Sequence, residues 1–232
     1  MGIFYGVGLG PGDPELLSIK GLAVLKRVGR IYTPGNRDGH SLAGEIVRYH
    51  LPDAPLEFLE MPMTHDRAVL EAAWRDGAER IRESLARIDV AFVTLGDPLL
   101  YGSYLYLYRQ IHTADPTLEI QTIPGITGFS AAAARCNVYL TEGNDRLLLL
   151  TGKTDRSQFQ RYCREFETLV FYKPGTEGAG LCDVFFANCP AGSGVLVSRC
   201  GMPGESVTPL QAGRILPLDY FSIIILHTKG KP

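Results

Sequence analysis

Three loops of this sequence combine glycines with a few reactive side chains. The first, GVGLGPGDPELLSIKG at residues 6–21, places four glycines at alternate positions directly after Ile3-Phe4-Tyr5. A glycine-rich turn after a first strand often holds a phosphate with its backbone N–H groups. The spacing of a dinucleotide site fails here in every frame, because Pro11, Asp13 or Glu15 stands where the third glycine is needed. We therefore expect a turn that lets the backbone approach a ligand closely, and not a phosphate site.

The second loop places an aspartate and a tyrosine at the end of an apolar strand. In VTLGDPLLYGSYLYLYR, residues 93–109, apolar residues run into Gly96-Asp97-Pro98, and Tyr101 lies in the same turn. Ligands bind at the carboxyl ends of strands in open α/β sheets, so Asp97 and Tyr101 are the candidate catalytic residues. An alternative of equal weight is that Asp97 forms an Asx-turn that merely reverses the chain.

The third loop opens a helix directly after a strand. It is PGITGFSAAAARCNVYLTEGND, residues 124–145. The backbone amides of Thr127 and Gly128 are placed to meet a ligand, although an ordinary helix cap gives the same pattern. The small residues that follow, at 131–134, permit close packing of the helix backbone.

Other catalytic signatures are incomplete. Gly152-Lys153-Thr154 ends like a P-loop, but position 147 is leucine where that motif needs glycine. Ser130 lacks the GxSxG elbow of a serine hydrolase. The histidines, at positions 40, 50, 65, 112 and 227, include no HExxH pair, and the cysteines, at 136, 163, 182, 189 and 200, include no CxxC pair. We therefore expect no metal site.

The loops need an alternating α/β scaffold to hold them. Apolar runs of strand type cover residues 3–9, 30–33, 90–95, 146–150, 169–172, 194–198 and 222–227, and another strand ends at residue 123. Helical stretches separate most of them; the clearest spans 66–88, with an apolar stripe at Leu70, Trp74, Ala78, Ile81, Leu85 and Ile88. This alternation predicts an α/β fold. The Pro124-Gly125 turn predicts two domains, 1–123 and 124–232.

Composition narrows the class of partner. The 232 residues are 45% hydrophobic and carry 23 basic and 25 acidic side chains, for a formal charge of −2. This balance gives no basic surface for nucleic acid or an anionic membrane. An odd number of unclustered cysteines and the absence of a leader or a membrane-length apolar run lead us to expect a soluble protein of the reducing cytoplasm.

Four motifs in order carry a family resemblance. With GVGLGPGDPELLSIKG, LGDPLLYGSYLYL, PGITGFSAAAA and LVFYKPG, the sequence from Gly2 to about His227 resembles the tetrapyrrole methylases, which are S-adenosylmethionine-dependent enzymes. Within that family, MPMTHD at 61–66, AAAARCNVYLTEGND and DYFSIIIL resemble the members that methylate C(20) of precorrin-2 in cobalamin biosynthesis. The resemblance implies two α/β domains with a ligand cleft between them, a tetrapyrrole acceptor, and a homodimer in which Tyr104, Tyr106 and Tyr108 supply core or interface.

The resemblance also implies which residues contact the methyl donor and its product, S-adenosylhomocysteine. In the N-terminal domain they are Pro11, Leu95, Gly96, Asp97, Leu100 and Tyr101. In the C-terminal domain they are Thr127, Gly128, Tyr172, Lys173, Cys200, Phe221 and Ser222. Lys173 stands where the family often has methionine, Gly128 replaces a common serine, and Gly102-Ser103-Tyr104 replaces a common Ser-Thr-Phe run. The departures at Gly128 and at Gly102-Ser103-Tyr104 leave the position of methylation open.

The implied reaction is attack of an electron-rich meso carbon on the donor methyl, followed by loss of the proton from that carbon. Candidate proton acceptors are Tyr101, His65, Asp66, Glu142 and Asp145. Because the acceptor carries many carboxylates, we expect a local excess of basic residues, and the candidates beside the loops are Arg37, Arg67, Arg109, Arg135, Arg146 and Lys153. Two alternatives stay open: a methylase acting at another ring position or on a diphthamide-type acceptor, and a donor-binding regulator without turnover.

Overall fold

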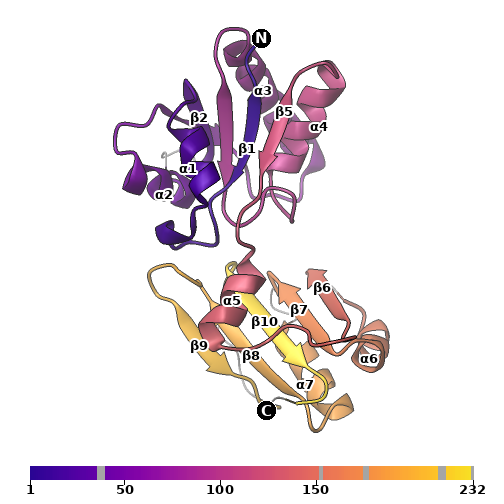
Figure 1. Cartoon of the computed structure of the whole chain (residues 1–232). Coiled ribbons are helices and arrows are strands. Elements are labelled where there is room, and N and C mark those ends of the chain that lie inside the picture. Colours follow the sequence, from indigo (N-terminus) through magenta and orange to yellow (C-terminus); the bar gives the residue numbers. More distant parts are fainter. Residues whose placement is uncertain (36–39, 152–153, 175–177, 214–217, 231–232) are drawn as a thin grey trace. The chain divides into compact units, whose positions relative to one another are not determined.

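A computed structural model describes residues 1–35, 40–151, 154–174, 178–213 and 218–230 of the chain (Figure 1). The chain forms two compact units, Met1–Thr127 and Gly128–Pro232, each built on its own five-stranded sheet. The expected α/β class with two α/β domains is confirmed. The units divide between residues 127 and 128, whereas the Pro-Gly turn placed the boundary after residue 123.

The sheet of the N-terminal unit is wholly parallel, in the order β3-β2-β4-β1-β5. Its strands are β1 (Phe4–Gly8), β2 (Arg30–Gly35), β3 (Leu56–Glu60), β4 (Val90–Thr94) and β5 (Ile120–Ile123). The helices between them are the 3-10 turn η1 (Pro14–Leu16), α1 (Ile19–Leu25), α2 (Leu42–His50), α3 (Arg67–Leu85) and α4 (Tyr104–Ala114).

Alternating strand residues divide the N-terminal core into two layers. Tyr5, Val7, Ala91 and Val93 pack with residues of α1 and α2 on one face. Their strand neighbours, among them Phe4, Val90 and Phe92, pack with α3 and α4 on the other. In Figure 1, α1 and α2 lie on one side of the sheet and α3 and α4 on the other. A parallel sheet covered on both faces needs such continuous apolar strands, which explains why the sequence signals β1 and β4 so clearly.

Helix α3 confirms the predicted helix and its apolar stripe. Asp66 caps the helix, with Oδ1 accepting from the backbone N–H of Ala68 at 2.9 Å and of Val69 at 3.3 Å. The stripe residues Ala78, Ile81 and Leu85 are buried. The helix ends at Leu85, three residues before the expected end, because residues 86–88 form a turn into β4.

The sheet of the C-terminal unit is mixed, in the order β6-β7-β10-β8-β9. Its strands are β6 (Leu147–Thr151), β7 (Thr168–Tyr172), β8 (Ser193–Ser198), β9 (Ser206–Pro209) and β10 (Ser222–His227). β6 and β7 are parallel, and β10 runs antiparallel to both β7 and β8. Helices α6 (Arg156–Glu165) and α7 (Gly178–Asn188) contribute Phe159, Cys163, Leu181 and Phe185 to the core on one face. Helix α5 (Gly128–Cys136) packs on β10 from the other face.

Two strands, β3 and β9, were absent from the predicted set. Both lie at a sheet edge. In β3 two glutamates alternate with apolar residues, and three of the four residues of β9 are exposed. Edge strands in partial contact with water carry no continuous apolar run, so the sequence pattern gave no signal for them.

In the described part of the chain, none of the helices combines the length and the apolarity that a membrane span requires.

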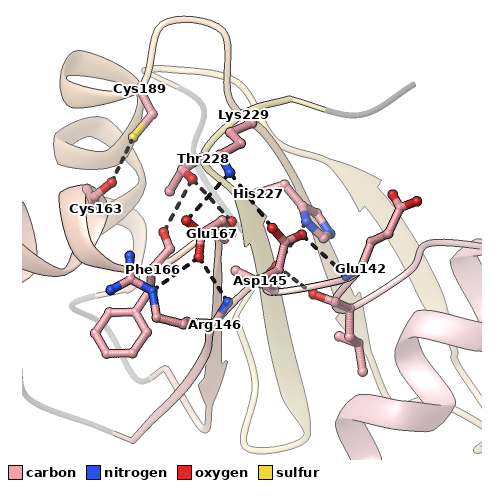
Figure 2. Close-up of polar contacts among 12 residues, drawn as sticks. Glu142, Asp145, Arg146, Cys163, Phe166, Glu167, Cys189, His227, Thr228 and Lys229 are labelled. Carbon is pink, nitrogen blue, oxygen red and sulfur yellow. Dashed lines mark hydrogen bonds and ion pairs between the residues drawn. The ribbon is translucent and has the colours of Figure 1, made fainter.

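A cluster of charged residues lies where strands β6 and β7 of the C-terminal sheet begin (Figure 2). One carboxylate oxygen of Glu167 accepts the backbone N–H of Arg146 at 2.9 Å and its Nε at 3.4 Å, and the other lies 3.5 Å from Lys229 Nζ. The backbone N–H of Arg146, the cation of Arg146 and that of Lys229 lower the pKa of Glu167 from 4.5 to about 2.

Replacing Glu167 by glutamine is expected to destabilise the protein by about 1–2 kcal/mol at pH 7, the contribution of a charge-assisted hydrogen bond at a partly exposed site. Because the pKa of the folded state is the lower one, this stabilisation is complete above pH 4.5 and declines as the pH falls towards 2. Urea unfolding at pH 7 and pH 3.5 measures both effects. Glu165→Gln, which removes an exposed pair with Arg161, is the control and should change stability by less than about 0.5 kcal/mol. Equal effects of the two substitutions would contradict the prediction.

Candidate functional site

In the N-terminal unit, the loops that follow β1 and β4 are hydrogen-bonded to each other. Gly96 N donates to Gly10 O at 2.7 Å, and Gly10 N lies 3.4 Å from Gly96 O, which makes an isolated antiparallel bridge beyond the parallel strands. Both glycines have positive φ, +80° for Gly10 and +69° for Gly96. Left-handed backbone at two facing positions explains why glycine occurs in both loops.

The loop after β5 joins this pair by direct backbone contact. A Cβ added to Gly125 would lie 2.1 Å from the carbonyl oxygen of Gly96, and one added to Gly8 would lie 2.6 Å from the Cα of Gly125. At Gly6, an added Cβ would lie 2.3 Å from the ring of Tyr104. Gly6 and Gly8 thus make room for Tyr104 and Gly125 of the protein itself, and Gly10 allows a left-handed turn; the approach of a ligand to this loop stays a prediction.

Asp97 connects two of the three loops. Its Oδ1 accepts the backbone N–H of Leu99 at 2.9 Å, which is the Asx-turn, and its Oδ2 accepts the backbone N–H of Gly125 at 3.0 Å. Of the two interpretations left open by the sequence, the turn is present, and it includes a link to the β5 loop that the sequence did not indicate. Contact of Asp97 with a ligand stays a prediction.

The other candidates of this unit lie around the same edge. Pro11 is buried directly after the Gly10 bridge, and Leu95 and Leu100 are half-buried in the β4 loop. Tyr101 is 45% exposed and has a φ of +53°. A left-handed conformation costs a non-glycine residue roughly 1–2 kcal/mol, and such strain is often found at functional sites. Thr127, two residues after Gly125, is half-buried.

The C-terminal unit brings its own candidates together where β7 and β8 end and β10 begins. Because β10 is antiparallel to β7 and β8, its first residues lie beside the ends of both strands. Lys173 N donates to Ser222 O at 3.2 Å, and Arg199 N donates to Phe221 O at 3.2 Å. The hydroxyls of Ser198 and Ser222 are 2.9 Å apart. Cys200 is buried directly after Arg199.

Helix α5 begins beside the same strand ends. The Tyr172 hydroxyl accepts the backbone N–H of Phe129 at 3.0 Å. A Cβ added to Gly128 would lie 2.9 Å from Cδ1 of Ile223 and 3.5 Å from the Tyr172 ring. A serine at this position would require the end of the flexible Ile223 side chain to shift by a few tenths of an ångström.

The chain matches the tetrapyrrole (corrin/porphyrin) methylases over residues 4–215. It belongs to that family. It is 34% identical over 170 residues to the probable cobalt-precorrin-2 C(20)-methyltransferase of Methanocaldococcus jannaschii, covering 73% of this chain and 71% of the relative. It is 28% identical over 236 residues to the cobalt-precorrin-2 C(20)-methyltransferase of Salmonella typhimurium, covering 97% and 96%.

Two further comparisons concern the length of a relative and the fold of a solved structure. The chain is 30% identical over 235 residues to the cobalamin biosynthesis protein CobIJ of Mycobacterium tuberculosis; the match covers 97% of this chain but 46% of CobIJ, so this methylase spans about half of that relative. The solved structure of uroporphyrin-III C-methyltransferase from Thermus thermophilus, in complex with S-adenosylhomocysteine, has a TM-score of 0.68, 20% identity and 97% coverage of both chains. The latter shows that the two share a fold.

Two of the expected proton acceptors, Asp66 and Asp145, form hydrogen bonds or ion pairs within the protein. Asp66 caps helix α3. Asp145 Oδ2 lies 3.3 Å from the backbone N of Glu142, and its Oδ1 lies 3.8 Å from Lys229 Nζ (Figure 2). Glu142 and Asp145 precede β6. They therefore lie where β6 and β7 begin, at the opposite end of these strands from the candidate loops. The structure therefore separates these two residues from the site proposed for that unit. His65 is exposed just before α3.

The expected basic residues are dispersed. Arg67 pairs with Glu71 on α3, and Arg146 pairs with Glu167 where β6 and β7 begin. Arg109 is exposed on α4. Arg135 pairs with Glu205, whose pKa is lowered because the backbone N–H of Gly201 and the Arg135 guanidinium donate to it. Arg37 and Lys153 lie outside the described residues. Sequence reasoning named Cys200 but missed Arg199, although its position directly after an apolar strand was a signal.

Proposed function

We propose that this methylase transfers the methyl group of S-adenosylmethionine to C(20) of precorrin-2 or cobalt-precorrin-2 in cobalamin biosynthesis. The observation that carries the proposal is full-length similarity: a named C(20)-methyltransferase aligns with 97% of this chain and 96% of its own length. The loops at the strand ends support the proposal. In the N-terminal unit the residues expected to contact the donor lie after β1, β4 and β5, and in the C-terminal unit they lie beside the ends of β7 and β8 and the start of β10.

The donor supplies an electrophilic methyl group on a sulfonium. The acceptor carbon forms a bond to that methyl, the C–S bond electrons stay on sulfur to give S-adenosylhomocysteine, and the acceptor carbon then loses its proton. The task of the protein is to hold the reacting atoms in line, and positioning of this kind contributes up to ~7–11 kcal/mol. In the N-terminal unit, the Gly10–Gly96 bridge and the Asp97–Gly125 bond hold the loop backbones in fixed positions.

The residues of the C-terminal unit suit parts of a nucleoside donor. Tyr172 and Phe221 offer aromatic surface for a base, and the loops beside Lys173 and Cys200 end strands whose backbone groups are fixed by β10. We propose that Pro11, Leu95, Gly96, Leu100, Tyr101 and Thr127 of the first unit and Gly128, Tyr172, Cys200, Phe221 and Ser222 of the second contact the donor.

Another methylation position is the main alternative, and it rested on Gly102 and Gly128. A Cβ added to Gly102 would lie 3.0 Å from the carbonyl oxygen of Pro98, so this glycine fits a tight turn. The C(20) assignment rests on the full-length similarity, and the labelling experiment decides between the ring positions.

The test is incubation of the purified protein with precorrin-2 and, separately, cobalt-precorrin-2, using donor labelled with ¹³C in its methyl group. We expect one label per acceptor at C(20), located by NMR, with stoichiometric S-adenosylhomocysteine. A label at another carbon would overturn the regiochemistry. Donor binding without formation of S-adenosylhomocysteine would favour a regulator. The two acceptors tell whether metal is required.

We also propose a cytoplasmic homodimer, on the family resemblance. The tyrosines of α4 no longer support it, because Tyr104 is buried in the core and Tyr106 stacks on Trp74 with ring centroids 3.9 Å apart. Sedimentation at micromolar concentration tests the dimer, and a monomer there would contradict it.

A further inference from the structure

Two cationic residues of the C-terminal unit have unusual backbone conformations at matching places. Lys173 has a φ of +50° and Arg199 a φ of +56°. Each is the first residue after a strand that flanks β10. Glycine or asparagine usually occupies such left-handed positions, so long cationic side chains at both require a reason.

Both residues are fixed to the start of the same strand. Lys173 N donates to Ser222 O and Arg199 N donates to Phe221 O, each at 3.2 Å. They therefore flank β10 at consecutive residues. Since neighbouring strands are about 4.8 Å apart, the two Cα atoms are separated by roughly 10 Å. At this separation each cation can bind an acidic group of its own.

Aromatic rings hold the two cations. Lys173 Nζ lies 4.6 Å from the ring centroid of Tyr220, and Arg199 Cζ lies 5.8 Å from that of Phe221. The two rings pack edge to face, 5.2 Å apart. A cation over an aromatic face keeps its charge, so these contacts orient the two side chains; Arg199 is in addition paired with Asp219.

Among the described residues, the charges nearby leave an excess of one positive charge, on Lys173. Arg199 Nη1 lies 3.6 Å from Asp219 Oδ2, and its Nε donates to Pro203 O at 3.0 Å. Asp219 Oδ1 also accepts the backbone N–H of Phe221 at 2.8 Å. Arg135 and Glu205 neutralise each other. Within the described residues, no carboxylate lies within ion-pair distance of Lys173. The protein as a whole carries −2, so this local excess is opposite in sign to the net charge.

We propose that Lys173 and Arg199 form a pair that binds carboxylate groups on the acidic side chains of the tetrapyrrole acceptor. This inference rests on the proposed function, which supplies a polycarboxylate acceptor. The Lys173 ammonium attracts one carboxylate as a point charge. The Arg199 guanidinium, whose Nε and Nη1 already face Pro203 and Asp219, offers its remaining N–H donors to a second. The resemblance assigned Lys173 to the donor; the pair assigns it to the acceptor, and makes it a determinant of specificity where relatives have methionine.

The methionine carboxylate of the donor has the same chemistry, so the experiment separates the two sources. Lys173→Met and Arg199→Gln are compared with wild type and with Lys229→Met. Lys229→Met removes an equal charge at the other end of the same strands, where Lys229 pairs with Asp145 and Glu167. The measurements are the KM for precorrin-2, kcat, and calorimetric Kd values for S-adenosylhomocysteine and for methylthioadenosine, which lacks the amino-acid part.

We expect each of the two substitutions to raise the KM for precorrin-2 about tenfold, the effect of one lost charge-assisted contact, and to weaken the salt dependence of that KM. The Kd of S-adenosylhomocysteine and kcat should stay within about twofold, and Lys229→Met should match wild type. An acceptor KM no different from that of Lys229→Met would overturn the proposal. A raised Kd for S-adenosylhomocysteine with an unchanged Kd for methylthioadenosine would overturn the acceptor assignment and give the pair to the donor. Absence of turnover in wild type would instead refute the proposed function, and circular dichroism melts show whether each variant is folded.

Discussion

Replacing Gly125 by alanine is expected to lower the free energy of unfolding by at least about 3 kcal/mol, and to abolish methyl transfer in whatever protein still folds. The added Cβ would lie 2.1 Å from the carbonyl oxygen of Gly96 and 2.8 Å from the Cα of Gly8. Both atoms belong to backbone, so no flexible side chain can move aside. Relief requires that the β1, β4 and β5 loops separate, and overpacking of that kind exceeds the usual 1–3 kcal/mol for an added methyl group.

Urea unfolding measures the first effect and formation of S-adenosylhomocysteine from precorrin-2 and the donor measures the second, while calorimetry gives the affinity for S-adenosylhomocysteine. Gly180→Ala is the matched control, because a Cβ there would meet nothing within 4 Å and the residue lies in helix α7. Alanine in a helix interior is favoured over glycine by up to about 1 kcal/mol, so the control should be neutral or slightly stabilised. A Gly125→Ala protein with wild-type stability and donor affinity would show that the three loops do not depend on their close contact.

Much of the scaffold follows from sequence because its causes are local. The apolar runs of β1 and β4, the stripe of α3 and the Asp66 cap are each set by residues within a few positions of one another. The edge strands β3 and β9 escaped prediction because half-exposed strands lack that local signal. The order β3-β2-β4-β1-β5 depends on pairings between distant segments and is not encoded in any single stretch.

The site was predicted as a set of loops but not as a set of contacts. The glycines and Asp97 were identified by their positions after strands. Their partners are far away in the chain: Gly96 meets Gly10, and Asp97 meets Gly125. Arg199 is inconspicuous in the sequence, and its significance comes from a positive φ and from its place across β10 from Lys173. Both properties exist only in the folded sheet.

Asp97→Asn tests whether the aspartate positions the loops or contacts a ligand. The carboxylate accepts two backbone N–H groups, from Leu99 and Gly125, with different oxygens. An asparagine has one oxygen and one NH₂ group. Because asparagine also forms Asx-turns, we expect its oxygen to keep the Leu99 bond. Its NH₂ group would then face the N–H of Gly125, donor against donor, and the link to the β5 loop would break.

The expected result is a ten- to hundredfold fall in kcat/KM, equivalent to about 1.5–3 kcal/mol for a lost bond to a charged acceptor. The Gly125 amide should also exchange its proton faster in the absence of ligand, which NMR of ¹⁵N-labelled protein measures directly. This second readout separates the two roles, since a carboxylate that only contacts a ligand has no effect on Gly125 in the free protein. If methyl transfer falls while exchange at Gly125 stays at the wild-type rate, Asp97 acts on the ligand and not through the loop. If neither changes, the bond to Gly125 has no part in holding the loops for the reaction, and the Gly10–Gly96 bridge must hold them alone.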